Sequence, residues 1–241
     1  MDHFLASLPN QSTSTLTDEA WTQLRRDIVL GVRHPGERLR IAKIRKIYGI
    51  GPTPLREALQ RLSTEGLVFA EGNRGFTVAP LDAEEFADLT TARIAIEREA
   101  LRLSIQHGSS DWEAEVVSAT YLMAKADREF PPGTDEWERA NTAFHRATVS
   151  ACRSIWLLRV RDGLHTLAER YRRASVSSER SQRDLGAEHK AISEAVLQRD
   201  AETAAELVSS HYYKTEFELR SVLYRNESGF CAEPRSDTAD R

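Results

Sequence analysis

The sequence has few cysteines, no long apolar segment and no recognisable secretory signal. Its two cysteines, Cys152 and Cys231, exclude a disulfide framework and a zinc site made of cysteines alone. No apolar run reaches the roughly 18 residues that a membrane span needs. The first residues, MDHFLASLPNQSTSTLTDEA, lack the basic and apolar regions of a signal peptide. We therefore expect a cytoplasmic protein that makes no contact with a membrane.

The sequence also lacks the short motifs that mark common enzyme sites. It contains no P-loop, no nucleophile elbow, no zinc-protease helix and no dinucleotide-binding glycine motif. Cys152 has no catalytic signature around it and is expected to be a small buried residue. We predict that the protein is not an enzyme.

Positive charge is concentrated near the N-terminus. The 241 residues carry a net charge of −4, yet the segment 21–61 holds ten Lys or Arg against three acids. That segment has a net charge of +7, and the rest of the chain therefore carries −11. A basic module in an acidic chain indicates a polyanionic partner, or a solvated basic face with no partner. Charge alone leaves both interpretations open.

The first 80 residues follow the pattern of a winged helix-turn-helix. Residues 1–15 are polar and predicted to be disordered, and residues 16–80 form the predicted DNA-binding domain. Apolar periodicity predicts three helices, and two β-prone runs around a glycine-rich turn predict a hairpin. Thr53 is predicted to cap the third helix, with Pro54 in its first turn. The predicted ranges are 17–32, 41–48 and 55–65 for the helices and 67–70 and 76–79 for the hairpin.

Such a module places the second helix of its helix-turn-helix motif in the major groove of DNA. A generic three-helix module has the same pattern, so the position of the charge decides between the two. Arg45, Lys46, Arg56 and Arg61 cluster around the turn and the recognition helix, and Arg74 lies at the predicted hairpin tip. This distribution favours DNA binding.

From residue 82 onward the sequence predicts only helices. Six helices with short connections indicate an antiparallel bundle over residues 82–224, and the polar tail 225–241 is predicted to be disordered. The fold class is therefore mainly α, with a small hairpin in the N-terminal domain. The predicted helices cover 82–107, 111–130, 135–152, 155–177, 179–198 and 200–224.

Several motifs resemble one family. The run PTPLREAL, followed by EGLV and NRGF, resembles the DNA-binding domain of GntR-type bacterial transcription regulators. The helical remainder resembles the FCD domain of the FadR subfamily, which binds effectors and forms dimers. The segments DEWERANTAFH and LAERYRR resemble the glutarate-responsive, CsiR-like branch.

The resemblance implies roles for residues of the N-terminal domain. It implies that Arg56 and the turn before it, with Thr53, contact DNA, and that the wing residues Asn73, Arg74 and Gly75 reach the minor groove. One departure matters, because Gly-Pro-Thr-Pro stands where the family has Ser-Arg-Thr-Pro. The base-reading arginine is missing, so we expect an operator that differs from the family's common half-site.

Three histidines in the helical region lie on apolar stripes. Asn141 and His145 share one helix face, and His189 and His211 each lie among apolar residues of their own helix. Spacing alone is compatible with structural core histidines or with a divalent ion such as Zn²⁺. The resemblance implies a metal site at these positions, made of an acid four residues before a histidine and of two later histidines. In this sequence Asn141 replaces the acid.

Arg93 is the other unusual residue, because it interrupts an apolar stripe. A buried guanidinium needs an anion, which is either an acid of the chain, such as Glu97, or a carboxylate ligand. The resemblance implies a small organic acid near this position. The metal and Arg93 together are expected to grip a C4–C6 dicarboxylate. The predicted effector-binding residues are Arg93, Asn141, His145, Tyr171, His189 and His211.

These features predict a homodimeric repressor that binds a pseudo-palindromic operator and is released by a small carboxylate such as glutarate. Two alternatives rest on the histidines. One is a regulator whose effector is the metal ion itself, and the other is a metal-dependent enzyme that the basic module only tethers to DNA.

Overall fold

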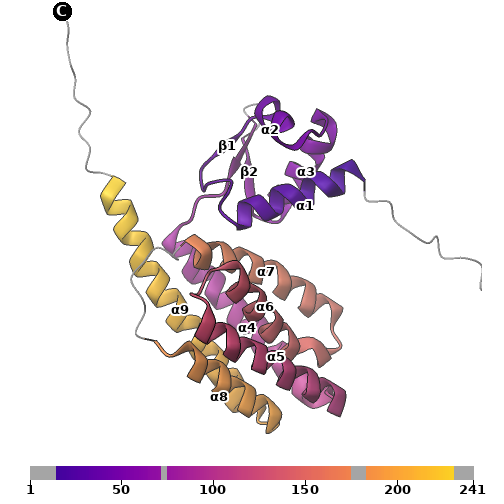
Figure 1. The fold of residues 1–241 in the computed structure, drawn as a ribbon, viewed down its shortest axis with the longest axis vertical. Helices are drawn as coiled ribbons and strands as arrows, with labels where there is room; N and C mark the ends of the chain where they lie inside the picture. Colours follow the sequence, from indigo (N-terminus) through magenta and orange to yellow (C-terminus); the bar gives the residue numbers. More distant parts are fainter. Residues whose placement is uncertain (1–14, 72–74, 175–182, 231–241) are drawn as a thin grey trace, which may run out of the picture. The chain divides into compact units, whose positions relative to one another are not determined.

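Figure 1 shows the fold in a computed structural model, which describes residues 15–71, 75–174 and 183–230. For residues 222 and 224–230 it describes only the backbone. The chain divides into two compact units, Met1–Pro80 and Leu81–Arg241, which we call unit 1 and unit 2. Asn73, Arg74 and most of the two predicted tails lie outside the described residues.

Unit 1 consists of three helices and a small antiparallel sheet. The sheet has the order β1-β3-β2, so the predicted hairpin is confirmed and its second strand is central. The first strand was not predicted, because two residues are too few to show the alternation of a strand. The elements are α1 (Leu16–Val29), β1 (Arg38–Leu39), α2 (Ile41–Tyr48), α3 (Pro52–Thr64), β2 (Val68–Ala70) and β3 (Phe76–Val78).

The helix α3 begins earlier than predicted. Gly51 precedes it in an extended conformation, and Pro52 is its first residue. The fixed φ of proline suits a first helical turn, where no N–H is needed. The predicted cap by Thr53 is therefore wrong, since Thr53 lies inside the first turn with its side chain exposed. Leu55 and Leu59 on the inner face are fully buried.

Unit 2 is a bundle of helices. The last helix continues past the predicted end at residue 224, because no proline or glycine interrupts the chain before Gly229 and an existing helix propagates readily. No helix of the described ranges combines the length and apolarity needed to cross a membrane. The helices are α4 (Ala83–His107), α5 (Ser110–Glu129), α6 (Asp135–Val149), the 3₁₀ turn η2 (Ser150–Cys152), α7 (Ile155–Ala174), α8 (Leu185–Leu197) and α9 (Ala201–Phe230).

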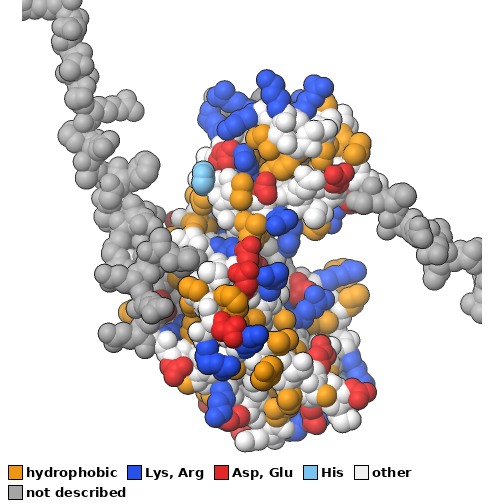
Figure 2. All heavy atoms as spheres, viewed as in Figure 1, with side chains coloured by type: hydrophobic (Ala, Val, Ile, Leu, Met, Phe, Trp, Pro, Cys, Tyr) orange, Lys and Arg blue, Asp and Glu red, His pale blue; other side chains and the backbone are white. Residues whose placement is uncertain are grey.

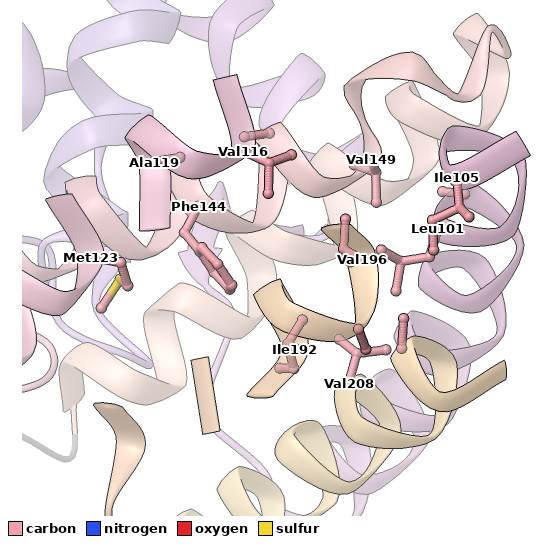
Figure 3. Packing of buried hydrophobic residues seen from close by; sticks show 14 of the residues in the cluster. Leu101, Ile105, Val116, Ala119, Met123, Phe144, Val149, Ile192, Val196 and Val208 are labelled. Atoms are coloured by element: carbon pink, nitrogen blue, oxygen red, sulfur yellow. The ribbon is translucent and has the colours of Figure 1, made fainter. Parts of the chain in front are cut away.

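The apolar core of unit 2 joins helices that are distant in sequence. Figure 3 shows Met123 of α5, Phe144 of α6, Ile192 and Val196 of α8 and Val208 of α9 packed together, all fully buried. Burying a side chain of this kind contributes about 1.5–3 kcal/mol. This packing fixes α6, α8 and α9 against one another, and the three predicted histidines lie on these helices.

Candidate DNA-binding surface and effector site

An exposed basic surface lies on α2 and α3 of unit 1. Arg45 and Lys46 are in the last turn of α2, while Thr53 and Arg56 are near the start of α3. All four side chains are exposed, and the two helices pack against each other. Figure 2 shows Lys and Arg side chains gathered along the edge of unit 1 that carries α2.

Much of this positive charge has no acidic partner. Arg61, later in α3, pairs with Asp18 at 3.2 Å. Within the described part of the chain, no ion pair involves Arg45, Lys46 or Arg56. A polyanion is the partner that unneutralised surface charge of this kind attracts.

The wing of unit 1 depends on a glycine. Gly75 has a φ of +106°, a conformation that other residues rarely adopt. The backbone N–H of Glu71 donates to the carbonyl oxygen of Gly75 at 2.9 Å and closes the turn. The geometry therefore requires glycine here, whether or not Gly75 also contacts DNA.

Three buried histidines converge in the interior of unit 2. His145 comes from α6, His189 from α8 and His211 from α9, and we call them the histidine cluster. Their potential ligand atoms all lie within 4.8 Å of one another. The ring centroids of His189 and His211 are 4.9 Å apart, and those of His145 and His211 are 5.3 Å apart. Imidazoles this close, from three helices, can serve a single metal ion.

Carboxylates orient two members of the cluster. Nδ1 of His189 lies 2.9 Å from Oδ2 of Asp127, and Nδ1 of His211 lies 2.9 Å from Oε2 of Glu188. Arg183 holds Glu188 in turn, with two hydrogen bonds of 2.7 and 2.5 Å. A carboxylate that accepts the Nδ1 proton leaves the Nε2 lone pair free, as is typical around metal-binding histidines.

Burial keeps members of the cluster neutral. It is the largest cause that lowers the pKa of His145 well below its usual range. Burial also lowers the pKa of His211 to about 3, although its hydrogen bond to the Glu188 carboxylate acts in the opposite direction. A neutral imidazole has a lone pair to offer at pH 7, whereas an imidazolium has none.

Asn141 is a fourth candidate ligand. It lies one turn before His145 on α6, is buried, and its Oδ1 has no hydrogen-bond partner among the described residues. The same holds for Nε2 of His189. Buried polar atoms without partners cost free energy that a ligand can restore. These residues fit a divalent ion such as Zn²⁺, held by nitrogen atoms and one neutral oxygen.

Arg93 is a buried cation without a carboxylate partner. Its guanidinium lies 4.0 Å from the ring centroid of Tyr212 and makes no hydrogen bond to the rest of the described chain. Glu97, the partner offered by the sequence, accepts instead two hydrogen bonds from Arg161, at 3.0 and 3.3 Å. The interpretation of Arg93 and Glu97 as a hydrogen-bonded pair is therefore wrong, because Arg161 on α7 takes up both carboxylate oxygens.

A second buried pair leaves the same excess of positive charge. Arg172 donates to both oxygens of Glu138 at 2.9 and 2.8 Å. Burial lowers the pKa of Arg93, and the positive charges of Arg172 and Arg161 act in the same direction. Three guanidinium groups therefore share two buried carboxylates, and a third acid, Asp162, is partly exposed and pairs with Arg161 at 3.0 Å. An anion beside Arg93 would balance the charge in the interior.

Tyr171 is the predicted effector residue whose described interactions are with residues other than the histidine cluster and Arg93. Its ring stacks on Phe86 at 4.3 Å. Its hydroxyl donates to Glu85 at 3.0 Å and accepts from the backbone N–H of Asp82 at 3.4 Å. These contacts tie α7 to the start of α4, and a role of Tyr171 in effector binding stays a prediction.

Sequence reasoning missed several residues of this site. His165 lies on the same buried face of α7 as Arg161 and Arg172, and this spacing of polar residues was a usable signal. Asp127 and Glu188 gave no signal, because a carboxylate on a helix is usually a solvated surface group.

Comparisons with known proteins show what the chain is similar to. Residues 16–78 match "Bacterial regulatory proteins, gntR family", and residues 88–214, more than half of the chain, match the "FCD domain". The chain belongs to the gntR family of bacterial regulatory proteins. This gntR-family chain therefore joins a winged helix-turn-helix to an FCD domain, as the sequence motifs predicted.

Relatives and structural neighbours agree with this assignment. The chain is 37% identical to the HTH-type transcriptional regulator BphR of Paraburkholderia xenovorans, over 85% of each chain. It is 35% identical to the HTH-type transcriptional repressor GlaR of Escherichia coli, over 80% of this chain and 90% of that one. McbR/YncC of E. coli shares the fold, with a TM-score of 0.72 and 18% identity over 87% of this chain and 99% of that one. The protein is a DNA-binding transcription regulator and not an enzyme. The alternative of a metal-dependent enzyme that the basic module tethers to DNA is therefore wrong.

Proposed function

We propose that the protein is a repressor that leaves its operator when a small dicarboxylate, such as glutarate, binds inside unit 2. The observation that carries this proposal is Arg93, a buried guanidinium without a carboxylate partner. The ring of Tyr212 links Arg93 to the histidine cluster, because its centroid lies 5.5 Å from that of His145 and 5.7 Å from that of His211. Arg93 and the cluster are thus two attachment points separated by one aromatic ring.

A dicarboxylate has the chemistry to use both points. One carboxylate accepts hydrogen bonds from the Arg93 guanidinium, whose planar fork matches it. The other meets the histidine cluster, where a bound Zn²⁺ would supply positive charge. Asn141 and the three histidines would hold that ion. A chain of four to six carbons suits the short separation of the two points.

The DNA-binding surface acts on a twofold operator in this proposal. Two copies of the chain bind the two half-sites of a pseudo-palindrome. Arg45 and Lys46 neutralise phosphates, and Arg56 and Thr53 contact a base edge or phosphate at the start of the recognition helix. The wing residues Asn73, Arg74 and Gly75 reach the minor groove. The effector shifts the dimer toward a geometry that does not span both half-sites. The name of the relative GlaR, a transcriptional repressor, supports repression.

The histidine cluster favours one other function, that of a metal-sensing regulator. Its ligand atoms lie within 4.8 Å of one another without help from an organic acid. In that case the ion alone changes the affinity for DNA.

Release from DNA tests the proposal and separates it from the alternative. An operator is selected from random DNA with the full-length, zinc-loaded protein, and binding is followed by fluorescence anisotropy. Succinate, glutarate and adipate are then titrated. We expect one of them to release the wild type and to raise its melting midpoint with the logarithm of its concentration.

Arg93→Ala should bind the operator as the wild type does but should not be released by the acid. The matched control is Arg98→Ala on the same helix, because Arg98 pairs with Glu202 near the surface at 3.3 Å. Normal release of Arg93→Ala would overturn the proposal. Different operator affinities of the zinc-loaded and the zinc-free protein, with no response to any acid, would establish the metal sensor.

A further inference from the structure

A fourth buried histidine lies beside the histidine cluster without belonging to it. His165 of α7 is only 5% exposed, and its ring centroid is 6.5 Å from that of His145. Its Nε2 lies 2.9 Å from Oγ1 of Thr142, whereas its Nδ1 has no hydrogen-bond partner in the described ranges. A buried ring nitrogen in this state costs free energy unless a bound molecule satisfies it.

His165 lies near the His145 side of the histidine cluster, on a helix face that also carries two buried arginines. Arg161 and Arg172 share the buried face of α7 with His165. Burial is the largest cause that lowers the pKa of His165, and the positive charges of Arg172, Arg161 and Arg93 act in the same direction, so the ring is neutral at pH 7. We expect the carbon chain of an effector that joins Arg93 to the cluster to lie beside this ring.

The free nitrogen calls for a particular kind of ligand group. The Nδ1 atom is a donor if the Thr142 hydroxyl donates to Nε2, and an acceptor if Nε2 carries the proton. A carboxylate oxygen only accepts hydrogen bonds, so it satisfies Nδ1 only when Nδ1 is a donor. The carboxylate of the effector already has donors in the guanidinium of Arg93. A hydroxyl group both donates and accepts, so it satisfies either state.

We propose that His165 is a specificity-determining residue whose Nδ1 forms a hydrogen bond with a hydroxyl group on the carbon chain of the effector. The site then prefers a hydroxy-dicarboxylate to the plain dicarboxylate of the same length. This inference rests on the proposed function, since it concerns the same effector site. Sites built to hydrogen-bond a hydroxyl reject the analogue that lacks it, because a buried polar group is then left without a partner.

Two near-isosteric variants separate the two ring nitrogens. The side-chain amide of His165→Asn reaches the position of Nδ1, and that of His165→Gln reaches the position of Nε2. Isothermal titration of the full-length, zinc-loaded proteins would compare glutarate with 2-hydroxyglutarate and succinate with malate. In the wild type and in His165→Asn, we expect the hydroxylated acid of the better-binding pair to bind at least about tenfold more tightly. In His165→Gln the preference should fall to about threefold or less, while the plain acid binds as before.

The opposite pattern would identify a purely structural role through the Thr142 hydrogen bond. If His165→Gln keeps the preference for the hydroxylated acid, the inference is overturned, whether or not His165→Asn keeps it too. If His165→Gln does not fold, equal binding of the paired acids by the wild type overturns it as well. If the wild type binds no dicarboxylate at all, the proposed function itself is wrong and the inference falls with it.

Discussion

The two units of this protein treat polar and charged side chains in opposite ways. In unit 1, no described polar or charged side chain is buried, and the core is built from residues such as Leu24, Leu55 and Leu59. In unit 2 the interior contains arginines, glutamates and histidines, among them Arg93, Glu97 and His145.

This difference follows from the size of the partner. DNA is too large to enter a protein, so the charges that bind it must stay on the surface, where water solvates them until DNA binds. A small effector can enter a bundle, and charges that meet it must be buried in advance. Buried charges are costly unless each has a partner, so unit 2 pairs Arg161 with Glu97 and Arg172 with Glu138. Arg93 is the exception, and for this reason we propose that it binds the effector.

The largest expected effect comes from breaking a buried pair. Glu97→Ala should lower the free energy of unfolding of unit 2 by about 3–5 kcal/mol, because Arg161 then loses its buried carboxylate and keeps only the partly exposed Asp162. Urea denaturation followed by circular dichroism measures the change. The control is Glu99→Ala on the same helix, which removes an exposed pair with Arg102 and should leave stability unchanged. Equal losses in both variants would show that burial of the pair is irrelevant.

Asp127 provides the next largest effect, through the histidine cluster. Asp127→Asn keeps the shape of the side chain but no longer accepts the Nδ1 proton of His189 as a carboxylate does. We expect zinc affinity, measured by competition with a chromogenic chelator, to fall by about 10–100-fold. Glu129→Gln, on the exposed side of the same helix beside Lys125, is the matched control. Unchanged zinc affinity in Asp127→Asn would remove the orienting role from Asp127.

On the DNA side, the comparison predicts that unpaired surface charge matters more than paired charge. Arg56→Ala should weaken binding to the selected operator by about 1–3 kcal/mol. Arg61→Ala in the same helix should have a smaller effect, because Arg61 is engaged with Asp18 and lies 3.9 Å from the ring centroid of Trp21. Fluorescence anisotropy at fixed salt measures both. If the two variants lose the same affinity, pairing does not decide which arginines bind DNA.

The smallest effect is expected at Lys46, the exposed cation at the end of α2. Lys46→Gln should weaken binding to all DNA sequences about equally and reduce the slope of log K against log salt by about 1. Anisotropy titrations at several salt concentrations, with operator and with random DNA, provide the measurement. A loss confined to the operator would instead make Lys46 a base-reading residue.

Much of the fold could be predicted from the sequence, because the deciding signals are local. Apolar spacing, together with stops such as Gly108, placed α4 and α5 close to their observed bounds. Predictions were wrong where a neighbouring residue or a distant strand outweighed the local rule. Thr53 is a good capping residue, but Pro52 starts the helix before it. The strand β1 exists only because β3 pairs with it.

The sequence by itself determined the winged helix-turn-helix, the helical bundle, the basic recognition region and the burial of His145, His189 and His211. Each of these depends on residues near one another in the chain. Only the tertiary structure decided which charges have partners. Arg161 on α7 takes Glu97 on α4, Arg93 is left over the ring of Tyr212, and Asp127 on α5 orients His189 on α8. Pairing between helices depends on how they pack, and helical periodicity within one segment contains no information about its neighbour.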